Sequence, residues 1–221
     1  MAIDLPSLGQ FHGFADGGAQ WSLTGVGLVL KDAAVPETSG GPPQTVRGIW
    51  NNFGAIIVTE AARVVTPIPV ELIIATIATE SRGNPNAERT EPGFQSYQTT
   101  PDRVSIGLTQ TLISSARSAL NDPAISDSSL RDPRTAIAAG CAYIASQFGK
   151  TGYDPPKVAC AYNAGGLYLN DSPNNRWKMR QFPIGTSAHA DRFVRWFNDC
   201  FLLFDTPATA PEGSFVRMLN S

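Results

Sequence analysis

The sequence is poor in cysteine, and the few cysteines that it has form no recognisable pattern. Cys141, Cys160 and Cys200 are widely spaced and include no CxxC pair. An odd number of cysteines argues against a disulfide framework, and the missing CxxC pair leaves a zinc site or a thioredoxin-like motif without support. We therefore expect three small buried thiols, and neither a metal site nor a cofactor.

An excess of one charge is also missing. The chain has 17 lysines and arginines against 19 aspartates and glutamates, which gives a formal net charge of -2. The basic residues are scattered, with no run that would follow a phosphate backbone. Nucleic acid is therefore not among the partners that we expect.

Long hydrophobic runs are absent as well. The longest, over residues 68–78, is interrupted by Pro69, Glu71 and Thr76 and is too short to span a bilayer. Residues 1–18 have neither the basic region nor the apolar region of a secretory signal. We expect a chain that is made in the cytoplasm, without a signal peptide and without stable membrane insertion.

The composition that remains is globular. Hydrophobic residues make up 42% and charged residues 16% of 221 residues, which is enough for one domain of ordinary size. Residues 1–45 are rich in Gly, Pro, Ser and Thr, and the alternation over Trp21–Leu30 predicts a short strand or hairpin. We expect an N-terminal arm at 1–45, a main domain at 46–205 and a Pro/Ala/Gly-rich tail at 206–221.

Helical patterns fill the main domain. Apolar residues recur at three- and four-residue spacing, Asp and Pro mark helix starts, and Gly marks helix ends. The helix expected over 69–81 is apolar around nearly its whole circumference, which is typical of a central, buried helix. The fold class is therefore mainly α, with helices expected at 45–64, 69–81, 108–120, 132–148, 155–165 and 188–204.

Glu80 stands at the end of that apolar helix. Burial of a carboxyl without a partner charge disfavours its ionised form, and the negative end of a helix acts in the same direction, so the pKa of Glu80 should be raised. A carboxyl that keeps its proton near neutral pH can act as a general acid on a glycosidic oxygen. Helix position alone favours the other interpretation, in which Glu80 is a solvated residue at a helix end.

Two later segments place polar side chains beside small residues, a combination that suits a groove for a sugar chain. In SIGLTQ at 105–110, a glycine permits close backbone approach and a glutamine offers both a donor and an acceptor. In AYNAG at 161–165, a phenol and an amide stand at a helix end. Each segment alone could be an ordinary helix entry or helix end.

Taken in order after Glu80-Ser81 and the turn at 82–84, these segments resemble the soluble lytic transglycosylases and the goose-type lysozymes. That superfamily carries a Glu-Ser pair, a Gly-Leu-x-Gln block and an Ala-Tyr-Asn-Ala-Gly segment, and the resemblance covers about residues 65–200. It implies a lysozyme-like single domain with a short N-terminal β or irregular arm. It also implies that the chain binds peptidoglycan glycan strands and cleaves them.

The resemblance assigns roles to single residues. Glu80 corresponds to the catalytic acid/base, and Ser81 to the residue that supports it. Tyr162 corresponds to a tyrosine near the catalytic carboxyl, where it could hydrogen-bond Glu80 or the substrate's N-acetyl group, or simply pack. The late family motif has an acidic residue where this chain has His189, which is either a site residue or structural. The substrate-binding residues expected are Ser81, Ser105, Gly107, Leu108, Gln110, Tyr162, Asn163 and His189.

The presence or absence of a second carboxylate bears on the product. Some goose-type lysozymes have an aspartate where this chain has Leu112, so the sequence favours the route without a second carboxylate, which forms 1,6-anhydro-N-acetylmuramic acid. Asp102 and Glu91 remain candidates, because they lie in the long loop after Glu80. Residues 90–97 of that loop could form a flap over the groove.

The resemblance therefore implies a peptidoglycan lytic transglycosylase, expected to be a monomer that acts on the cell wall. Without a signal peptide, such an enzyme fits a phage endolysin, a virion-borne lysin or a substrate of a dedicated secretion machine. Two alternatives stay open: a hydrolytic lysozyme or chitinase of the same superfamily, and a non-catalytic wall-binding or virion protein.

Overall fold

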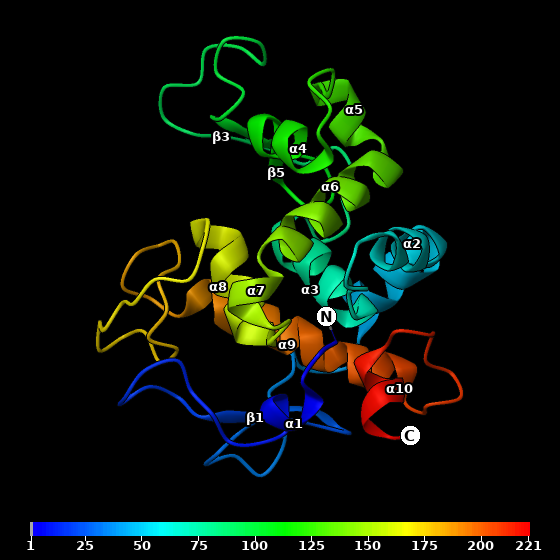
Figure 1. Ribbon diagram of the computed structural model, residues 1–221, viewed down its shortest axis with the longest axis vertical. Helices are drawn as coiled ribbons and strands as arrows, with labels where there is room; N and C mark the ends of the chain where they lie inside the picture. The colour runs from blue at the N-terminus through cyan, green and yellow to red at the C-terminus, as the bar shows by residue number, and fades with distance from the viewer. Residues whose placement is uncertain (1) are drawn as a thin grey trace.

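A buried helix lies at the centre of the computed structural model, which describes residues 2–221 (Figure 1). This helix, α3 (Val70–Glu80), begins directly after Pro69. It is followed by Arg82 and Gly83, which both have positive φ, so the chain turns sharply after the helix ends. Every residue of α3 before Glu80 is buried, which confirms the prediction of a central apolar helix.

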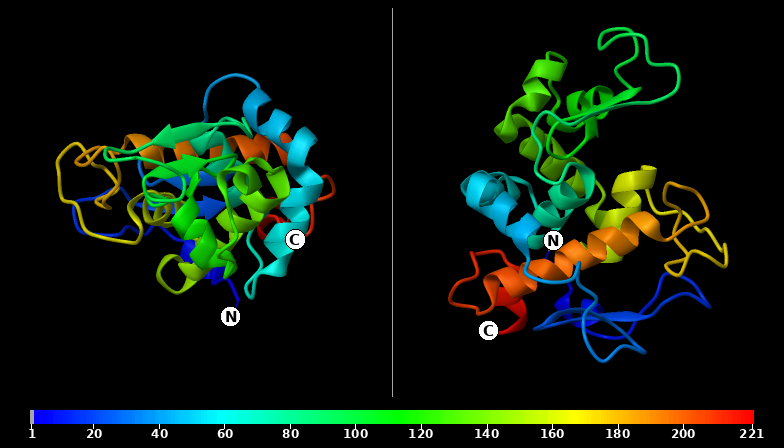
Figure 2. Two further views of the ribbon diagram at one scale, coloured as in Figure 1. Left: turned by 90° about the horizontal axis from the view of Figure 1, so that it is seen from above. Right: turned by 180° about the vertical axis from the view of Figure 1, so that it is seen from behind.

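Four longer helices contact α3, namely α2 (Gln44–Arg63), α6 (Pro133–Ser146), α8 (Pro155–Ala164) and α9 (Ala188–Phe204). The starts of α6 and α8 follow sequence signals, because Asp132 and Asp154 each accept a backbone N–H at the helix N-terminus and are followed by proline. α9 crosses the lower part of the molecule, with α3 on one side and the N-terminal hairpin on the other (Figure 2). The predicted helices in these four regions are confirmed.

A small lobe sits above this helical bundle (Figure 1). It contains an antiparallel sheet of order β3-β4-β5 and two short helices. Its apolar cluster, which includes Val104, Ile113 and Leu130, is separate from the main core. α6 joins the lobe to the bundle, because it packs against helices of both. The elements of the lobe are β3 (Glu88–Thr90), β4 (Val104–Ile106), β5 (Thr111–Leu112), α4 (Ile113–Leu120) and α5 (Asp127–Arg131).

The helix predicted over 108–120 is wrong in its first part, because the helix begins only at Ile113. The preceding residues instead form the tight turn between β4 and β5, in which Gly107 and Gln110 have φ of 79° and 49°. A right-handed helix cannot pass through two such positions. Position 107 requires glycine, since a Cβ there would lie 2.0 Å from the carbonyl oxygen of Leu130.

The N-terminal segment is built around a hairpin, as the sequence predicts. α1 (Leu5–Leu8) precedes β1 (Trp21–Thr24) and β2 (Gly27–Leu30), and the two strands pair antiparallel. Asn198 of α9 holds the hairpin, because its side chain accepts a hydrogen bond from the Leu28 amide (2.8 Å) and donates one to the Leu28 carbonyl (3.1 Å). The arm therefore packs on the bundle, while the boundaries of arm, main domain and tail stay predictions.

The C-terminal segment folds back onto the start of α3. There α10 (Phe215–Leu219) begins, and Glu71 accepts hydrogen bonds from the amides of Phe215 (3.0 Å) and Val216 (3.1 Å). α7 (Phe148–Thr151) and a largely irregular stretch over 167–187 complete the chain. All three cysteines are free and buried, as expected. Within residues 2–221, none of the helices combines the length and the apolar character that a bilayer span requires.

Candidate active site

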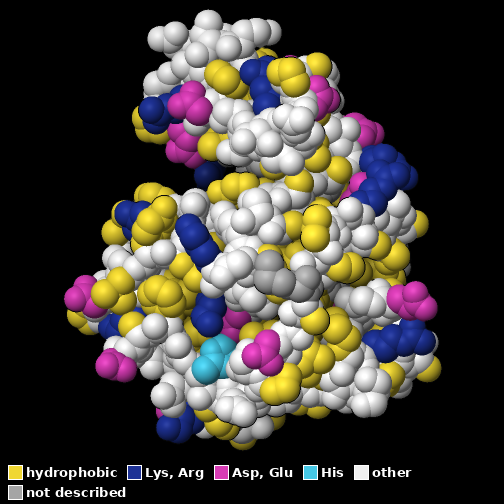
Figure 3. Space-filling model, viewed as in Figure 1, with side chains coloured by type: hydrophobic (Ala, Val, Ile, Leu, Met, Phe, Trp, Pro, Cys, Tyr) yellow, Lys and Arg dark blue, Asp and Glu magenta, His cyan; other side chains and the backbone are white. Residues whose placement is uncertain are grey.

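A cleft of about 690 Å³ opens between the small lobe and the helical bundle. Figure 3 shows the molecule hollowed between these two parts. The walls of the cleft come from the C-terminal ends of α3 and α8, from the β3–β5 sheet and from the start of α9. The predicted site residues that the structure brings together on these walls are Glu80, Ser105, Gln110, Tyr162, Asn163 and His189.

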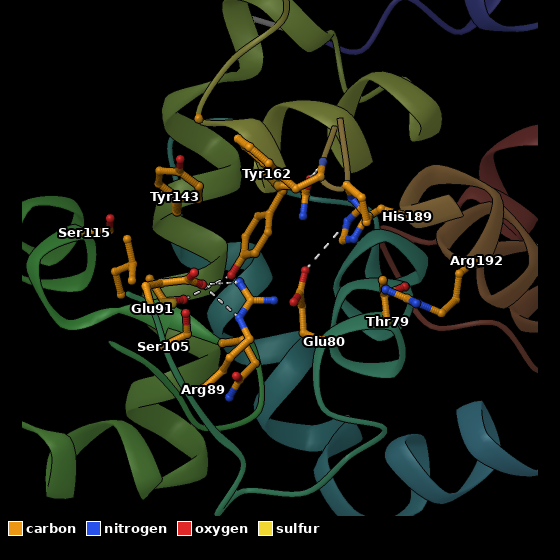
Figure 4. A pocket seen from close by; sticks show the side chains of 17 residues that line it. Thr79, Glu80, Arg89, Glu91, Ser105, Ser115, Tyr143, Tyr162, His189 and Arg192 are labelled. Carbon is orange, nitrogen blue, oxygen red and sulfur yellow. Dashed lines mark hydrogen bonds and ion pairs between the residues drawn. The ribbon is translucent and has the colours of Figure 1, made fainter. Parts of the chain in front are cut away.

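The carboxyl of Glu80 points into this cleft (Figure 4). Its side chain is 13% exposed. Burial raises the pKa of Glu80 to about 7, while the guanidinium groups of Arg89 and Arg192 act in the opposite direction. Near neutral pH the carboxyl is therefore divided between its protonated and ionised forms. A group in that state can both give and take a proton.

His189 lies beside Glu80 and comes from α9. Its Nε2 is 3.7 Å from Oε1 of Glu80, which is too long for a direct hydrogen bond, and its side chain is 4% exposed. Burial, with the nearby charges of Arg192 and Arg89, lowers the pKa of His189 to about 3, so the imidazole is neutral at neutral pH. His189 is therefore an uncharged wall residue next to the carboxyl.

Tyr162 connects α8 to the turn between β4 and β5. Its hydroxyl donates to the carbonyl oxygen of Thr109 (2.7 Å) and lies 3.0 Å from Oγ1 of Thr111. A phenol has one proton to donate, and here that proton goes to Thr109 instead of Glu80. Burial, together with the charge of Glu80, raises the pKa of Tyr162, so its hydroxyl stays protonated. Tyr162 thus holds the cleft wall beside the carboxyl in place.

Three of the predicted substrate-binding residues, Ser81, Gly107 and Leu108, are not among the residues that line the cleft. The hydroxyl of Ser81 donates to the Leu108 carbonyl (2.7 Å) and accepts from the Gly83 amide (3.2 Å), so it joins the end of α3 to the β4–β5 turn. Leu108 is fully buried in the main core and cannot contact a sugar through its side chain. Gly107 shapes the turn. We therefore regard Ser81, Gly107 and Leu108 as residues that position the wall.

The side chains of Gln110 and Asn163 form some of their hydrogen bonds within the protein. Nε2 of Gln110 donates to the carbonyl oxygens of Ala87 (2.9 Å) and Gly107 (3.0 Å). Both protons of that amide are thus used, and only its Oε1 remains for a ligand. Oδ1 of Asn163 accepts a hydrogen bond from the Phe182 amide at 2.5 Å, so its amide nitrogen is the group left for a ligand.

The long loop after Glu80 brings one of its two candidate carboxylates to the cleft. Glu91 lines the cleft, and its Oε1 is bound by Arg89 through Nε (3.0 Å) and a terminal nitrogen (2.9 Å) (Figure 4). Asp102 is 58% exposed and lies outside the cleft lining. Within the predicted flap at 90–97, Glu91 lines the cleft, whereas Phe94 and Tyr97 pack against the apolar cluster of the small lobe.

Several cleft residues were missed from the sequence, among them Thr79, Arg89 and Arg192. Thr79 precedes Glu80, and its Oγ1 is buried without a hydrogen-bond partner among the described residues. Arg192 follows His189 by one turn of α9, and Arg89 lies on β3. Residues three apart share one face of a helix, so helical spacing from His189 is the signal that could have found Arg192.

A comparison with protein families shows to which family the chain belongs. The family model of the transglycosylase SLT domain matches residues 58–181, which is more than half of the chain. The chain belongs to the transglycosylase SLT domain family. The matched region of this SLT domain contains Glu80, Gln110 and Tyr162, whereas His189 and Arg192 follow its end.

The fold of the SLT domain is similar to a solved structure. The 70 kDa soluble lytic transglycosylase SLT70 from Escherichia coli matches it with a TM-score of 0.50 and 16% sequence identity. The match covers 79% of this chain and 33% of that chain, so the SLT domain spans about a third of the length of SLT70. At this identity the comparison shows the shared, mainly helical fold alone. A comparison with curated proteins found no match.

Proposed function

We propose that this SLT domain is a peptidoglycan lytic transglycosylase in which Glu80 acts first as an acid and then as a base. The observation that carries the proposal is one buried carboxyl with a pKa raised to about 7, facing a cleft lined by hydroxyl, amide and guanidinium groups. Family membership supports the same assignment. The bond cleaved would be the β-1,4 linkage from N-acetylmuramic acid to N-acetylglucosamine.

In the first step, protonated Glu80 transfers its proton to the bridging oxygen, and the bond between that oxygen and C1 of the muramyl residue breaks. N-acetylglucosamine leaves with a free 4-hydroxyl, and the substrate's own N-acetyl group stabilises the positive charge at C1. A neutral His189 favours this step, because an imidazolium 3.7 Å from Glu80 would lower the pKa of the carboxyl.

In the second step, ionised Glu80 removes the proton of the muramyl 6-hydroxyl. That oxygen forms a bond to C1 and closes a 1,6-anhydro ring, and Glu80 is left protonated for the next cycle. No water enters the product. A pKa near the working pH suits a single group that must serve as acid and base in turn.

Hydrolysis is the second candidate, and the position of Glu91 is the observation that favours it. A second carboxylate in the cleft could activate water against C1. Because Arg89 binds Oε1 of Glu91 twice, at 2.9 and 3.0 Å, the carboxylate is held in place by the guanidinium and is less free to bind a water molecule. For this reason we favour the transglycosylase.

Product masses decide between the two reactions. Purified sacculi are digested with the protein, and the soluble fragments are analysed by mass spectrometry. We expect 1,6-anhydro ends, which are lighter than reducing ends by one water, about 18 Da. If the wild type instead forms reducing ends, and if Glu91→Gln forms fewer of them, the reaction is hydrolysis. Cleavage of chitin oligomers without cleavage of sacculi would establish a chitinase. If Glu80→Gln lysed walls as well as the wild type does, the protein would be a non-catalytic wall-binding or virion protein.

We also propose that the protein acts on the cell wall as a monomeric, endolysin-type bacteriolytic enzyme. The reaction proposed above assigns both proton transfers to Glu80, so it requires no residue from a second chain. Light scattering coupled to gel filtration should give the mass of one chain. When the protein is added to bacteria with a permeabilised outer barrier, the turbidity of the suspension should fall. Unchanged turbidity, together with cleavage of isolated sacculi, would contradict the endolysin-type role.

A further inference from the structure

The N-terminal arm contacts the segment of chain that leads into α9. The amide of Ala19 donates to the Arg176 carbonyl (2.6 Å), and the indole of Trp21 packs edge-on against that of Trp177, with 5.4 Å between the ring centres. The arm precedes residue 58, at which the match to the family model begins. The reaction proposed above uses no residue of the arm, so these contacts have no role in it so far.

A carboxylate of the arm binds Arg176 through two hydrogen bonds. Glu37 lies in the segment that joins β2 to α2, and its two carboxylate oxygens accept from the two terminal nitrogens of Arg176 at 2.7 Å each. Two parallel hydrogen bonds fix the orientation of the guanidinium as well as its position. The same guanidinium holds the pKa of Glu37 below its ordinary value, so the carboxylate is ionised at neutral pH.

The third nitrogen of that guanidinium binds Asp191, in the first turn of α9. Oδ1 of Asp191 accepts from Nε of Arg176 (2.7 Å) and from the indole N–H of Trp177 (2.8 Å), and its Oδ2 accepts from the Ser187 hydroxyl (2.7 Å). Two routes from the arm, one ionic and one through the packed indole rings, therefore end on this one side chain. Three donors from the preceding segment hold the first turn of α9 in place.

That first turn also carries the residues that border the catalytic carboxyl. His189 stands two positions before Asp191, and its Nε2 is 3.7 Å from Oε1 of Glu80. Arg192 follows Asp191 directly, and Figure 4 shows it on the same side of Glu80 as His189. A shift of this turn would move His189 away from Glu80 and admit water to the carboxyl. Because burial is what raises the pKa of Glu80, water at that point would lower the pKa.

We propose that Glu37 is a positioning residue for the reaction. Through Arg176 and Asp191 it holds the start of α9, and hence His189, against the catalytic carboxyl. The arm is thus part of the catalytic unit, although it lies outside the region that the family model matches. This inference rests on the proposed function for its effect on catalysis, whereas its effect on the carboxyl is measurable without substrate.

The pKa of Glu80 is a suitable readout because Glu37→Gln leaves its surroundings chemically unchanged. The charged and titratable groups that line the cleft with Glu80 are Arg89 of β3, Glu91 of the following loop, Tyr143 of α6, Tyr162 of α8, and His189 and Arg192 of α9. The variant keeps all of them. A changed pKa of Glu80 therefore reports a changed position of the wall, provided that the direct effect of the removed charge is screened by salt.

The test measures the titration midpoint of Glu80 by ¹³C NMR of the glutamate carboxyl carbons, in the full chain without substrate. At about 1 M salt the Debye length is about 3 Å, so the removed charge itself has little effect. Glu37→Gln and Asp191→Asn should each lower the midpoint by about one pH unit, toward the ordinary value of 4.5. Because both residues act through one chain of contacts, the double variant should shift it no further than Asp191→Asn alone.

Glu60→Gln is the matched control. Glu60 is also bound by arginines, Arg63 at 3.0 Å and Arg134 at 2.6 Å, but it joins α2 to α6 and does not line the cleft. This variant should lower the Tm without moving the midpoint of Glu80. An unchanged midpoint in Glu37→Gln, or an equal shift in Glu60→Gln, would overturn the positioning role.

Kinetics on sacculi connect the readout to the reaction. With the midpoint one unit lower, kcat/KM of Glu37→Gln should fall about eightfold at pH 7.5 and stay nearly unchanged at pH 5, because the reacting proton is lost only at the higher pH. An equal loss at both pH values would indicate general destabilisation and overturn the inference. A wild type that cleaves neither sacculi nor chitin oligomers would contradict the proposed function, and the NMR midpoints would still decide whether Glu37 positions the wall beside Glu80.

Discussion

Glu71 in the first turn of α3 and Glu80 at its last residue are two carboxyls buried by the same apolar helix. Glu71 is fully buried and accepts hydrogen bonds from the Ser214 hydroxyl and from the amides of Phe215 and Val216. Glu80 is 13% exposed and, within residues 2–221, receives no hydrogen bond. Burial raises the pKa of both carboxyls.

The difference shows how one helix can serve both stability and chemistry. At Glu71 the donors of α10 replace the water that the carboxyl has lost, so the contact ties the C-terminal segment to the core. At Glu80 nothing replaces that water, and the cost of burying the carboxyl persists as a raised pKa. A buried group left without a partner at the edge of a cleft is typical of a functional site.

The largest expected effect comes from Glu80→Gln. The amide keeps the shape of the side chain but cannot donate or accept the reacting proton, so kcat/KM on sacculi should fall by about 10³-fold. Because the folded state disfavours the ionised form of Glu80, the free energy of unfolding of wild type should decrease as the pH rises from about 4.5 through about 7. At pH 8 the variant should therefore be more stable than wild type, by up to about 3 kcal/mol. Activity retained in Glu80→Gln would contradict the catalytic role of Glu80.

The opposite result is expected at the other end of the helix. Glu71→Gln loses an acceptor in a fully buried site and turns an amide N–H towards the donors of α10, which should cost about 3 kcal/mol. Tm in thermal unfolding should fall by about 6–12 °C. The folded variant should keep its activity. Glu212→Gln, an exposed carboxyl in the tail, is the matched control and should change neither quantity.

The pH dependence of the reaction tests whether Glu80 has the raised pKa described above. Glu80 must carry its proton in the first step, so kcat/KM should fall about tenfold per pH unit above the pKa of about 7. Initial rates on solubilised glycan strands between pH 5 and pH 9 would show this limb. A decline that begins instead near the ordinary pKa of a glutamate, about 4.5, would mean that burial does not act on Glu80 as described.

The smallest effect is expected from Tyr162→Phe. The variant loses the hydrogen bond to the Thr109 carbonyl, which should cost about 1 kcal/mol of stability and reduce kcat/KM about threefold through a looser cleft wall. The midpoint of the pH profile should not move. A shift of that midpoint by about one unit would show that the phenol interacts directly with Glu80.

Local signals in the sequence were sufficient to predict much of the fold. The apolar circumference of α3 indicated a central helix, Asp132 before a proline indicated the start of α6, and the alternation around Trp21 indicated the hairpin. Position at the end of α3 did not by itself identify Glu80, which was proposed from the ordered motifs at 80–84, 105–110 and 161–165. Each of these features depends on residues that lie close together in the chain.

Features that depend on distant residues could not be predicted in the same way. The turn at Gly107 is imposed by the backbone of Leu130, and the contact between Glu71 and Phe215 joins opposite ends of the chain. Leu108 matched a binding motif but is fully buried, because residues of that segment form the turn as well as the groove surface. Such contacts are fixed by tertiary packing, which periodicity does not encode.

The central claim is that burial holds the pKa of one unpaired carboxyl near neutrality. A direct test is a ¹³C NMR titration of protein labelled at the glutamate carboxyl carbons, with the Glu80 signal assigned by its loss in Glu80→Gln. The account predicts a midpoint of about 7 for that signal. A midpoint near 4.5, as for an exposed glutamate, would contradict it.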